Sequence, residues 1–375
     1  MKRSSAQRRK IESILEPADI RVNGSRPWDL RVRDERLYAR ILADGTLGVG
    51  EAYMDGWWDS EALDQLVCRA VSTGLEDRLK PWHLIGDIVI ARMKNLQKPA
   101  RAFQIGRHHY DLGNDLFEAM LDSRMIYSCG YWADADTLDE AQTAKLDLVA
   151  RKLMLEQDMR VLDIGCGWGG AARYFAEAYG VEVVGITVSE KQLQLGQEIV
   201  SGLPVDLRLQ DYRALDESFD RIYSIGMFEH VGHRNYRTYF DVVKRCLDAG
   251  GLFLLHTIGT NITRPGVDPW IARYIFPNGE LPSARQIARA AEGTLLLEDW
   301  HNFGPDYEQT LMCWHENFEA AWPELRENYD ERFHRAWRYY LLTSAGSFRA
   351  RANQLWQTVW STGSAGSIYR PAEPR

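Results

Sequence analysis

The segment "VLDIGCGWGG", residues 161–170, constrains the fold of this chain more than any other feature. A short apolar run contains an acid near its end, and four glycines follow within six residues. Gly165 and Gly167 would let a ligand approach bare backbone, because glycine has no side chain to stand in the way. The alternative is a tight structural turn without a ligand. Asp163 favours a ligand, since the end of a buried strand would otherwise prefer an apolar residue.

Strand-like and helix-like segments alternate from about residue 137 onward. Such alternation predicts an α/β fold with a doubly wound parallel sheet covered by helices. Ligands of such sheets bind at the carboxyl ends of the strands, where the glycine segment lies. A later strand at 294–300 and aromatic-rich helices from 309 onward are expected to complete or cap the sheet. The other expected elements are helices at 137–155, 170–179, 189 onward and 235–248, and strands at 160–165, 181–187, 205–211, 219–226 and 252–259.

The N-terminal part of the chain follows a different pattern. With 375 residues, the chain exceeds the usual size of a single domain. Residues 11–105 look mainly helical, with turns expected at 23–29 and 44–58. We therefore predict a smaller, mainly helical N-terminal domain at 1–105 and an α/β domain at 106–375.

Composition excludes several classes of protein. The net charge of −8 argues against wholesale nucleic-acid binding. The five cysteines are scattered without CxxC pairs, which predicts neither a disulfide framework nor a metal site and favours a reducing cytoplasm. The sequence also has no uninterrupted apolar run of ~18–20 residues, the length that a membrane-spanning helix needs.

The glycine segment is a poor match to a dinucleotide site. A dinucleotide fold needs an acid about 20 residues further on, at the end of the second strand, to hold a ribose. That strand ends in "GITVSEKQ", without an acid at its tip. The stretch "LDIGCGWG" instead resembles the S-adenosylmethionine loop of class I methyltransferases. "QDYR", residues 210–213, follows the third strand, where those enzymes hold the adenine.

Six further stretches identify a narrower family. Through them the chain closely resembles the bacterial cyclopropane-fatty-acyl-phospholipid synthases from about residue 20 onward. Mycolic acid cyclopropane synthases are similar from about residue 105 and lack the N-terminal domain. The resemblance implies a Rossmann-like, mostly parallel seven-stranded sheet and an N-terminal domain that binds lipid or membrane. The stretches are residues 53–64, 108–132, 224–236, 254–259, 274–283 and 299–311.

The resemblance implies a reaction and the residues that carry it. The family adds a methylene bridge across a cis double bond of a phospholipid acyl chain. The carbon comes from S-adenosylmethionine, and a bound bicarbonate ion takes the proton whose loss closes the ring. The bicarbonate site falls on Cys129, Glu229, His256, Ile258 and Tyr307. Contacts to S-adenosylmethionine fall on Tyr127, Ser128, Asp163, Gly165, Gly167, Thr187, Val188, Gln192, Asp211 and Tyr212, with Gln192 replacing the missing ribose acid.

A basic segment suggests how the substrate is reached. Residues 80–107 carry a local net charge of +5, against −13 for the remainder, and the apolar residues of the segment 81–98 follow one helix face. Lys94, Lys98 and Arg101 would meet the anionic headgroups of a membrane surface. Alternatively, the apolar face packs inside the N-terminal domain and the charges are solvated. The resemblance further implies a homodimer in the cytoplasm, peripherally associated with the inner membrane.

Two other functions remain open. A related fatty-acyl methyltransferase would form the same intermediate and quench it differently; intact Cys129, Glu229, His256 and Tyr307 favour ring closure. A lipid-binding protein with a vestigial methyltransferase fold is disfavoured by the intact glycine segment.

Overall fold

The computed structural model describes residues 2–78, 113–264, 266–363 and 369–370. The chain forms two compact units. The first, here called the helical unit, comprises Met1–Asn95, Pro265–Pro277 and Tyr307–Asn353; the second, the sheet unit, comprises Leu96–Arg264, Asn278–Asp306 and Gln354–Arg375. The predicted boundary at residue 105 lies outside the described residues, and so does the basic segment with Lys94, Lys98 and Arg101.

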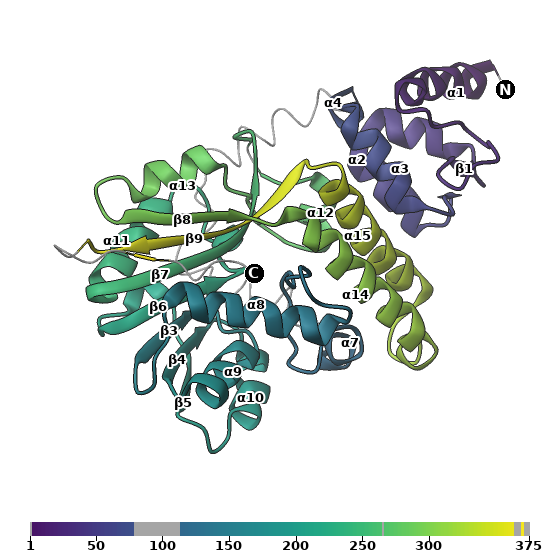
Figure 1. The fold of residues 1–375 in the computed structure, drawn as a ribbon. Coiled ribbons are helices and arrows are strands. Elements are labelled where there is room, and N and C mark those ends of the chain that lie inside the picture. The colour runs from purple at the N-terminus through teal and green to yellow at the C-terminus, as the bar shows by residue number, and fades with distance from the viewer. Residues whose placement is uncertain (1, 79–112, 265, 364–368, 371–375) are drawn as a thin grey trace. The chain divides into compact units, whose positions relative to one another are not determined.

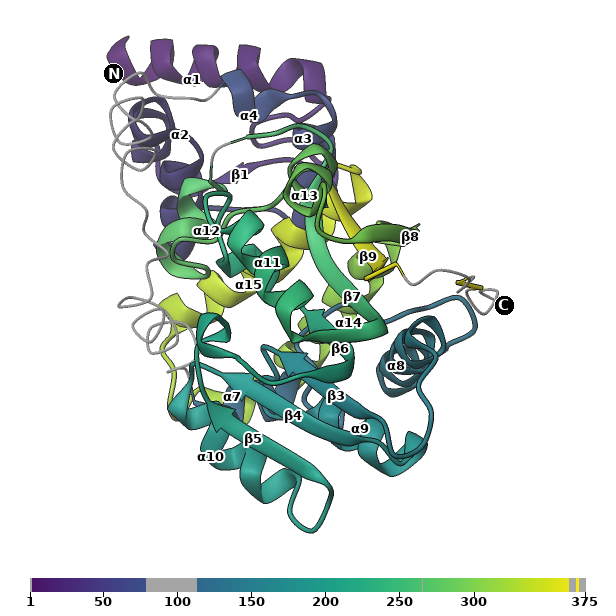
Figure 2. The same cartoon turned by 90° about the vertical axis from the view of Figure 1, so that its left-hand side faces the viewer.

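The sheet unit is built on a seven-stranded sheet with the strand order β5-β4-β3-β6-β7-β9-β8. The strands from β5 to β7 are parallel to their neighbours, whereas β8 runs antiparallel to β9. Figure 2 shows β5, β4, β3, β6 and β7 side by side. The predicted doubly wound, mostly parallel fold is therefore confirmed. The strands are β3 (Arg160–Ile164), β4 (Glu182–Thr187), β5 (Val205–Leu209), β6 (Phe219–Ile225), β7 (Leu247–Thr260), β8 (Leu296–Asn302) and β9 (Asn353–Ser361).

Helices cover both faces of this sheet (Figure 1). Successive strand residues point to opposite faces, so Val161 packs in one apolar cluster while Leu162 packs in the other. Burying each such side chain stabilises the fold by roughly 1.5–3 kcal/mol. One cluster includes α8 (Leu138–Leu153) and α9 (Gly170–Tyr179), and the other includes α11 (Tyr236–Cys246) and α13 (Ala284–Ala291). The remaining elements of the unit are α7 (Asn114–Met120), α10 (Glu190–Ile199), and the short 3-10 turns η2 (Tyr212–Ala214) and η3 (Phe228–His230).

The starts of the helices follow from local sequence. Thr137 caps α8: its hydroxyl accepts a hydrogen bond from the Glu140 amide at 3.3 Å, and the Glu140 carboxylate accepts one from the Thr137 amide at 3.0 Å. This reciprocal arrangement satisfies amides that a helix start leaves without partners. Ser189 caps α10 in a similar way, through the Gln192 amide at 3.3 Å. The predicted helices at 137–155 and from 189 onward are thus confirmed.

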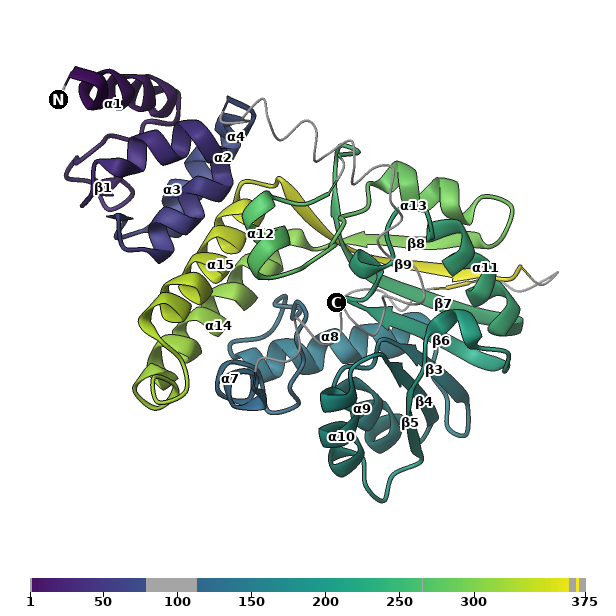
Figure 3. The same cartoon turned by 180° about the vertical axis from the view of Figure 1, so that it is seen from behind.

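The C-terminal part differs from the prediction. Helices α14 (Gly304–Leu325) and α15 (Glu331–Arg349) were expected to complete or cap the sheet, but their residues from 307 onward belong to the helical unit. They lie side by side there (Figure 3), joined by an ion pair between Arg338 and Glu319 at 3.1 Å. The chain then returns to the sheet as β9, a strand that the prediction missed. Its buried glutamines and threonine, Gln354, Gln357 and Thr358, break the apolar pattern expected of a central strand.

One turn that was expected in the helical unit is mostly helix in the structure. A turn was expected at residues 44–58, but α2 (Arg36–Met54) continues through most of them with a break at Gly45, where φ is 59°. Gly50 has a packing role instead: a Cβ there would lie 2.4 Å from the Trp270 ring. The other elements of this unit are α1 (Lys2–Leu15), η1 (Glu16–Ala18), β1 (Arg31–Val32), β2 (Trp58–Asp59), α3 (Leu63–Ser72), α4 (Leu75–Arg78) and α12 (Pro269–Tyr274).

The helical unit is packed around large aromatic side chains. Trp58, Trp270 and Trp337 are fully buried in it. Helix α15 approaches α3 closely because Gly346 has no side chain; a Cβ there would lie 2.4 Å from the Asp64 carbonyl oxygen. None of the helices in the described ranges combines the length and apolar character that crossing a bilayer requires.

Candidate active site

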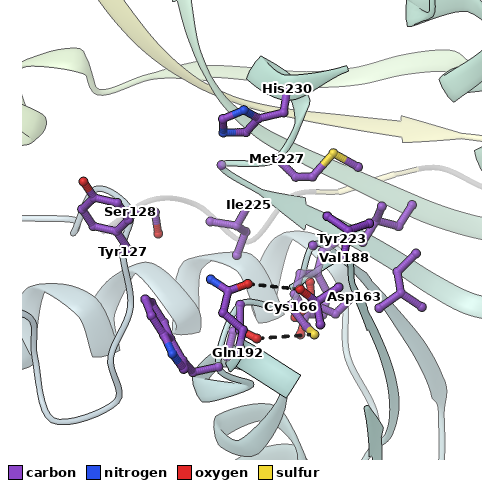
Figure 4. A pocket seen from close by; sticks show the side chains of 18 of the residues that line it. Tyr127, Ser128, Asp163, Cys166, Val188, Gln192, Tyr223, Ile225, Met227 and His230 are labelled. Atoms are coloured by element: carbon purple, nitrogen blue, oxygen red, sulfur yellow. Dashed lines mark hydrogen bonds between the residues drawn. The ribbon is translucent and has the colours of Figure 1, made fainter. Parts of the chain in front are cut away.

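A cavity lies at the carboxyl ends of β3, β4 and β6 in the sheet unit (Figure 4). The loop at 125–128, the glycine segment and the segment at 210–213 form its walls, together with Lys145 of α8 and His230 of η3. This is the edge at which open α/β sheets bind ligands. All ten residues predicted to contact S-adenosylmethionine line this one cavity: Tyr127, Ser128, Asp163, Gly165, Gly167, Thr187, Val188, Gln192, Asp211 and Tyr212.

The glycine segment requires glycine for two reasons. Gly165 and Gly167 have φ values of 96° and 54°, a left-handed region that other residues enter only with strain. A Cβ at Gly165 would lie 2.7 Å from the Met227 side chain, whereas one at Gly167 would meet no atom of the described residues within 4 Å, apart from its chain neighbours. Gly167 lines the cavity, so a ligand there can approach its backbone.

Two ionisable side chains of the cavity wall, Asp163 and Lys145, are buried from water. Asp163 is 2% exposed and Lys145 is fully buried. Burial raises the pKa of Asp163 to about 7, against the opposing effects of Tyr223 and Lys145. Burial lowers the pKa of Lys145 to about 8, opposed by Asp122, Cys129 and Asp163. Near neutral pH the ammonium therefore stays mostly charged beside a carboxyl group that titrates.

Hydrogen bonds orient the polar side chains near β4 and β5. The Thr187 hydroxyl donates to Gln192 Oε1 at 3.1 Å, which leaves the Gln192 amide nitrogen as a donor for a ligand hydroxyl. Asp211 is engaged differently: its carboxylate accepts hydrogen bonds from the Arg213 amide at 2.9 Å and from the guanidinium at 2.6 and 2.8 Å. The Gln192 side chain is thus held by Thr187, which agrees with its predicted contact to a ribose, while the Asp211 carboxylate is bonded to Arg213 within its own turn.

Glu229 and Ile258, two members of the predicted bicarbonate site, are in direct contact. The Ile258 amide donates to Glu229 Oε1 at 2.7 Å. Glu229 is 7% exposed, and its Oε2 has no hydrogen-bond partner in the described part of the chain. Burial raises the pKa of this carboxyl to about 7, although the Ile258 amide opposes the shift. The amide of Ile258 therefore orients Glu229.

His256 lies two residues before Ile258 on β7, so the two side chains point to the same face of the sheet. It is 1% exposed, and burial lowers its pKa well below the ordinary value, so the ring is neutral. Its Nδ1 lies 3.3 Å from the side-chain nitrogen of Gln357 on β9. With the Gln357 amide in this orientation, Nδ1 accepts the hydrogen bond and Nε2 carries the proton of the neutral ring. Nε2 has no partner among the described residues.

The other two predicted members lie elsewhere. Cys129 is fully buried beside Ser128, and its thiol donates to the Gly130 carbonyl at 3.1 Å. Tyr307, on α14, belongs to the helical unit, where its ring packs on Phe348 with centroids 4.6 Å apart. The structure thus joins Glu229 to Ile258 and places Tyr307 in a different unit from the other four.

Lys145, which lines the cavity, and Gln142, which holds the loop at 125–128, both lie on α8 and were missed by the sequence interpretation. Gln142 donates to the Ser128 carbonyl at 2.7 Å, and Lys145 Nζ donates to the Ser128 hydroxyl at 3.0 Å. A signal existed in the sequence: Leu138, Gln142, Lys145 and Val149 recur at alternating spacings of four and three, so both polar residues share the apolar face of α8.

The comparisons with known proteins agree with this geometry. A family model described as mycolic acid cyclopropane synthetase matches residues 97–358. The cyclopropane-fatty-acyl-phospholipid synthase of Escherichia coli (strain K12) is 55% identical over 357 residues, which cover 95% of this chain and 93% of that protein. A probable fatty acid methyltransferase of Pseudomonas putida is 41% identical over 255 residues, covering 64% of each chain.

A solved structure extends the likeness to three dimensions. The crystal structure of mycolic acid cyclopropane synthase CmaA1 complexed with SAH and CTAB is 34% identical in sequence, with a TM-score of 0.65. It covers 69% of this chain, and the alignment spans 97% of that protein. Since the family model covers well over half of the chain and the bacterial relative nearly all of it, the chain belongs to the mycolic acid cyclopropane synthetase family.

Proposed function

We propose that this protein is a cyclopropane-fatty-acyl-phospholipid synthase. It transfers a methylene group from S-adenosylmethionine to the cis double bond of an unsaturated phospholipid acyl chain and releases one proton. The observation that carries this proposal is the 55% identity to the E. coli synthase over nearly the full length of both chains. The cavity at the glycine segment supports it, because the ten residues expected to contact the cofactor line one space.

S-adenosylmethionine supplies an electrophilic methyl group when it is bound. The residues of the cavity fit such a ligand: bare backbone at Gly167, a donor on Gln192 and a buried carboxyl on Asp163. An alkene is a weak nucleophile, so the site must hold both reactants close together and exclude water. Buried walls that already carry oriented polar groups serve both needs.

Bicarbonate is the ion that we assign to Glu229 and His256. When bound, it supplies the base that takes the proton from the added carbon. Two buried polar atoms support the assignment, since Glu229 Oε2 and His256 Nε2 find no partner in the described ranges. Leaving such atoms unpaired costs about 1–3 kcal/mol each, which a polar ligand would offset. Bicarbonate has acceptor oxygens for the Nε2 proton of His256 and a hydroxyl for Glu229. Ile258 contributes to the proposed site by orienting Glu229. The assignments of Cys129 and Tyr307 to it rest on the family resemblance alone.

The substrate lies in a bilayer, so the enzyme acts at a membrane surface without spanning it. We assign docking to the basic segment with Lys94, Lys98 and Arg101, and we place the protein on the cytoplasmic side of the inner membrane, as a homodimer. Each cation near an anionic surface contributes ~1 kcal/mol to binding, and salt screens this attraction.

A vesicle co-sedimentation assay tests the docking segment. The triple variant Lys94→Glu, Lys98→Glu, Arg101→Glu should no longer bind anionic vesicles but should keep its cofactor affinity. If the variant sediments like wild type at low and at high salt, another surface docks on the membrane.

A fatty-acyl methyltransferase is the second candidate, because the P. putida relative carries that name. The product distinguishes the two reactions. The protein is incubated with methyl-labelled S-adenosylmethionine and vesicles of cis-unsaturated phospholipid, and the extracted lipid is examined by NMR. Ring closure gives cyclopropane protons and removes the alkene signal. A label that enters the lipid without ring protons would support the methyltransferase, and no transfer of label would contradict both.

A further inference from the structure

A charged lysine without exposure to water lines the cofactor cavity, and the proposed reaction gives it no role. Lys145 on α8 is fully buried, and its Nζ lies 3.0 Å from the Ser128 hydroxyl oxygen. Burying an ammonium group is costly unless an anion or several acceptors compensate for it. Ser128 Oγ is its hydrogen-bond partner within the described residues, which leaves ammonium protons for a further acceptor.

The bond to Lys145 fixes what the Ser128 hydroxyl does. An ammonium only donates, so the hydroxyl oxygen accepts this bond and must direct its own proton elsewhere. Gln142 holds the same loop by donating to the Ser128 carbonyl at 2.7 Å and to the Ile126 carbonyl at 3.3 Å. Figure 4 shows Ser128 with Tyr127 on the loop that borders the cavity. Lys145 and Ser128 thus both offer hydrogen-bond donors to the cofactor cavity, and the donor of Lys145 is charged.

Such a pair of donors selects an anionic group. The part of S-adenosylmethionine that matches it is the carboxylate of the methionine end, the only anionic group of that molecule. We propose that Lys145 and Ser128 form the subsite for this carboxylate, Lys145 as the charge and Ser128 as the directed donor. The inference rests on the proposed function for its ligand. It differs from a structural role, in which Lys145 only neutralises the nearby carboxyls of Asp122 and Asp163.

The test compares two ligands that differ by the carboxylate alone. Binding of S-adenosylmethionine and of decarboxylated S-adenosylmethionine is measured by calorimetry on the full chain, without lipid. Lys145→Met should weaken the binding of S-adenosylmethionine by about 10- to 100-fold, the usual cost of losing a hydrogen bond to a charged group. The affinity for the decarboxylated ligand should stay nearly unchanged, so the affinities for the two ligands should become similar. An equal loss for both ligands, or no loss for either, would overturn the subsite.

Lys152 provides a matched control. It lies on the same helix, is 2% exposed and pairs with Asp299 at 3.0 Å, but it does not line the cavity. Lys152→Met should cost folding stability without changing the preference between the two ligands. A shift in that preference equal to the one of Lys145→Met would show a general effect of removing a buried charge and would overturn the subsite.

Ser128→Ala keeps the inference testable if Lys145→Met does not fold. It removes one hydroxyl from the loop and should weaken S-adenosylmethionine selectively, by about 3- to 10-fold. An unchanged ratio of the two affinities would contradict the subsite. The outcome is separate from that of the proposed reaction, because a wild-type protein that prefers the carboxylate but forms no cyclopropane lipid would refute the reaction and not the subsite.

Discussion

The cofactor cavity and the residues Glu229 and His256 differ in how their polar side chains are held. In the cavity, Thr187 bonds Gln192 and Lys145 bonds Ser128. Glu229 Oε2 and His256 Nε2 are equally buried but find no partner in the described part of the chain. We infer that internal hydrogen bonds organise the cavity for affinity, whereas the proposed anion would pair with Glu229 and His256. Changes in the first region should alter binding, and changes in the second should alter turnover.

The largest effect is expected at Glu229. Glu229→Gln keeps the shape of the side chain but removes an ionisable group, and kcat should fall by roughly 10²–10⁴-fold, the range for a group that assists proton transfer. The affinity for S-adenosylmethionine should stay close to that of wild type, because Glu229 does not line the cavity. Steady-state rates and calorimetry give the two quantities. Glu217→Gln, which breaks an ion pair with Arg208, is the control that should leave kcat unchanged. An affinity loss as large as the kcat loss at Glu229 would remove the distinction between the two regions.

The same substitution should change how stability depends on pH. The pKa of Glu229 is raised to about 7 in the folded state, from about 4.5. An acid with a raised pKa binds more protons when folded, so its contribution to stability is fullest below the unfolded pKa and is lost between about pH 4.5 and 7. Relative to Glu229→Gln, wild type should lose about 3 kcal/mol across this window and change little above it. Urea unfolding at pH 5 and pH 8 measures the difference; a constant difference would mean that the buried carboxyl does not titrate there.

Gly167→Val should weaken cofactor binding in addition to straining the backbone. The side chain would occupy the space left for the ligand, and a β-branched residue at positive φ is strained, so cofactor affinity should fall by roughly 10- to 100-fold, with strain of about 1–3 kcal/mol. Gly202→Val is a matched control, because Gly202 also has positive φ, 82°, and open space but does not line the cavity. Both variants should lose similar stability in a thermal melt. Equal cofactor affinity in the two variants would contradict the role of the glycine segment.

The smallest effect is expected at Thr187. Thr187→Val removes the hydroxyl that orients Gln192, and the loss of one neutral hydrogen bond, about 0.5–1.5 kcal/mol, predicts a 2- to 10-fold weaker cofactor affinity. Thr187→Ser keeps the hydroxyl and should bind like wild type. If valine and serine behave alike in calorimetry, the Thr187–Gln192 bond does not contribute to binding.

The sequence was informative where local pattern and structure coincide. The alternating segments from 137 to 260 predicted the parallel sheet, and the motif residues meet at the ends of its strands. It failed where distant contacts decide. The glycines after residue 45 read as a turn, but Gly50 makes room for Trp270, more than two hundred residues later.

Two failures at the site have the same origin. Lys145 was missed because a lysine in a helix is normally solvated, and its burial depends on Ser128 from an earlier loop. Gln357, the partner of His256, lies on β9, whose buried polar residues disguised the strand. In both cases the sequence signal was a polar residue on an otherwise apolar face. It could be interpreted only once the partner on the neighbouring element was known.

If Glu229 and His256 hold a small anion that takes part in ring closure, the formation of cyclopropane lipid must depend on that anion. The direct test is the rate of cyclopropane formation by wild-type protein, with bound bicarbonate removed and then restored in steps in carbon dioxide-free buffer. The rate should be low without bicarbonate and should rise to saturation as bicarbonate is restored, while the S-adenosylmethionine affinity stays constant. A full rate without bicarbonate, or a rise matched by tighter cofactor binding, would show that Glu229 and His256 do not hold such an anion.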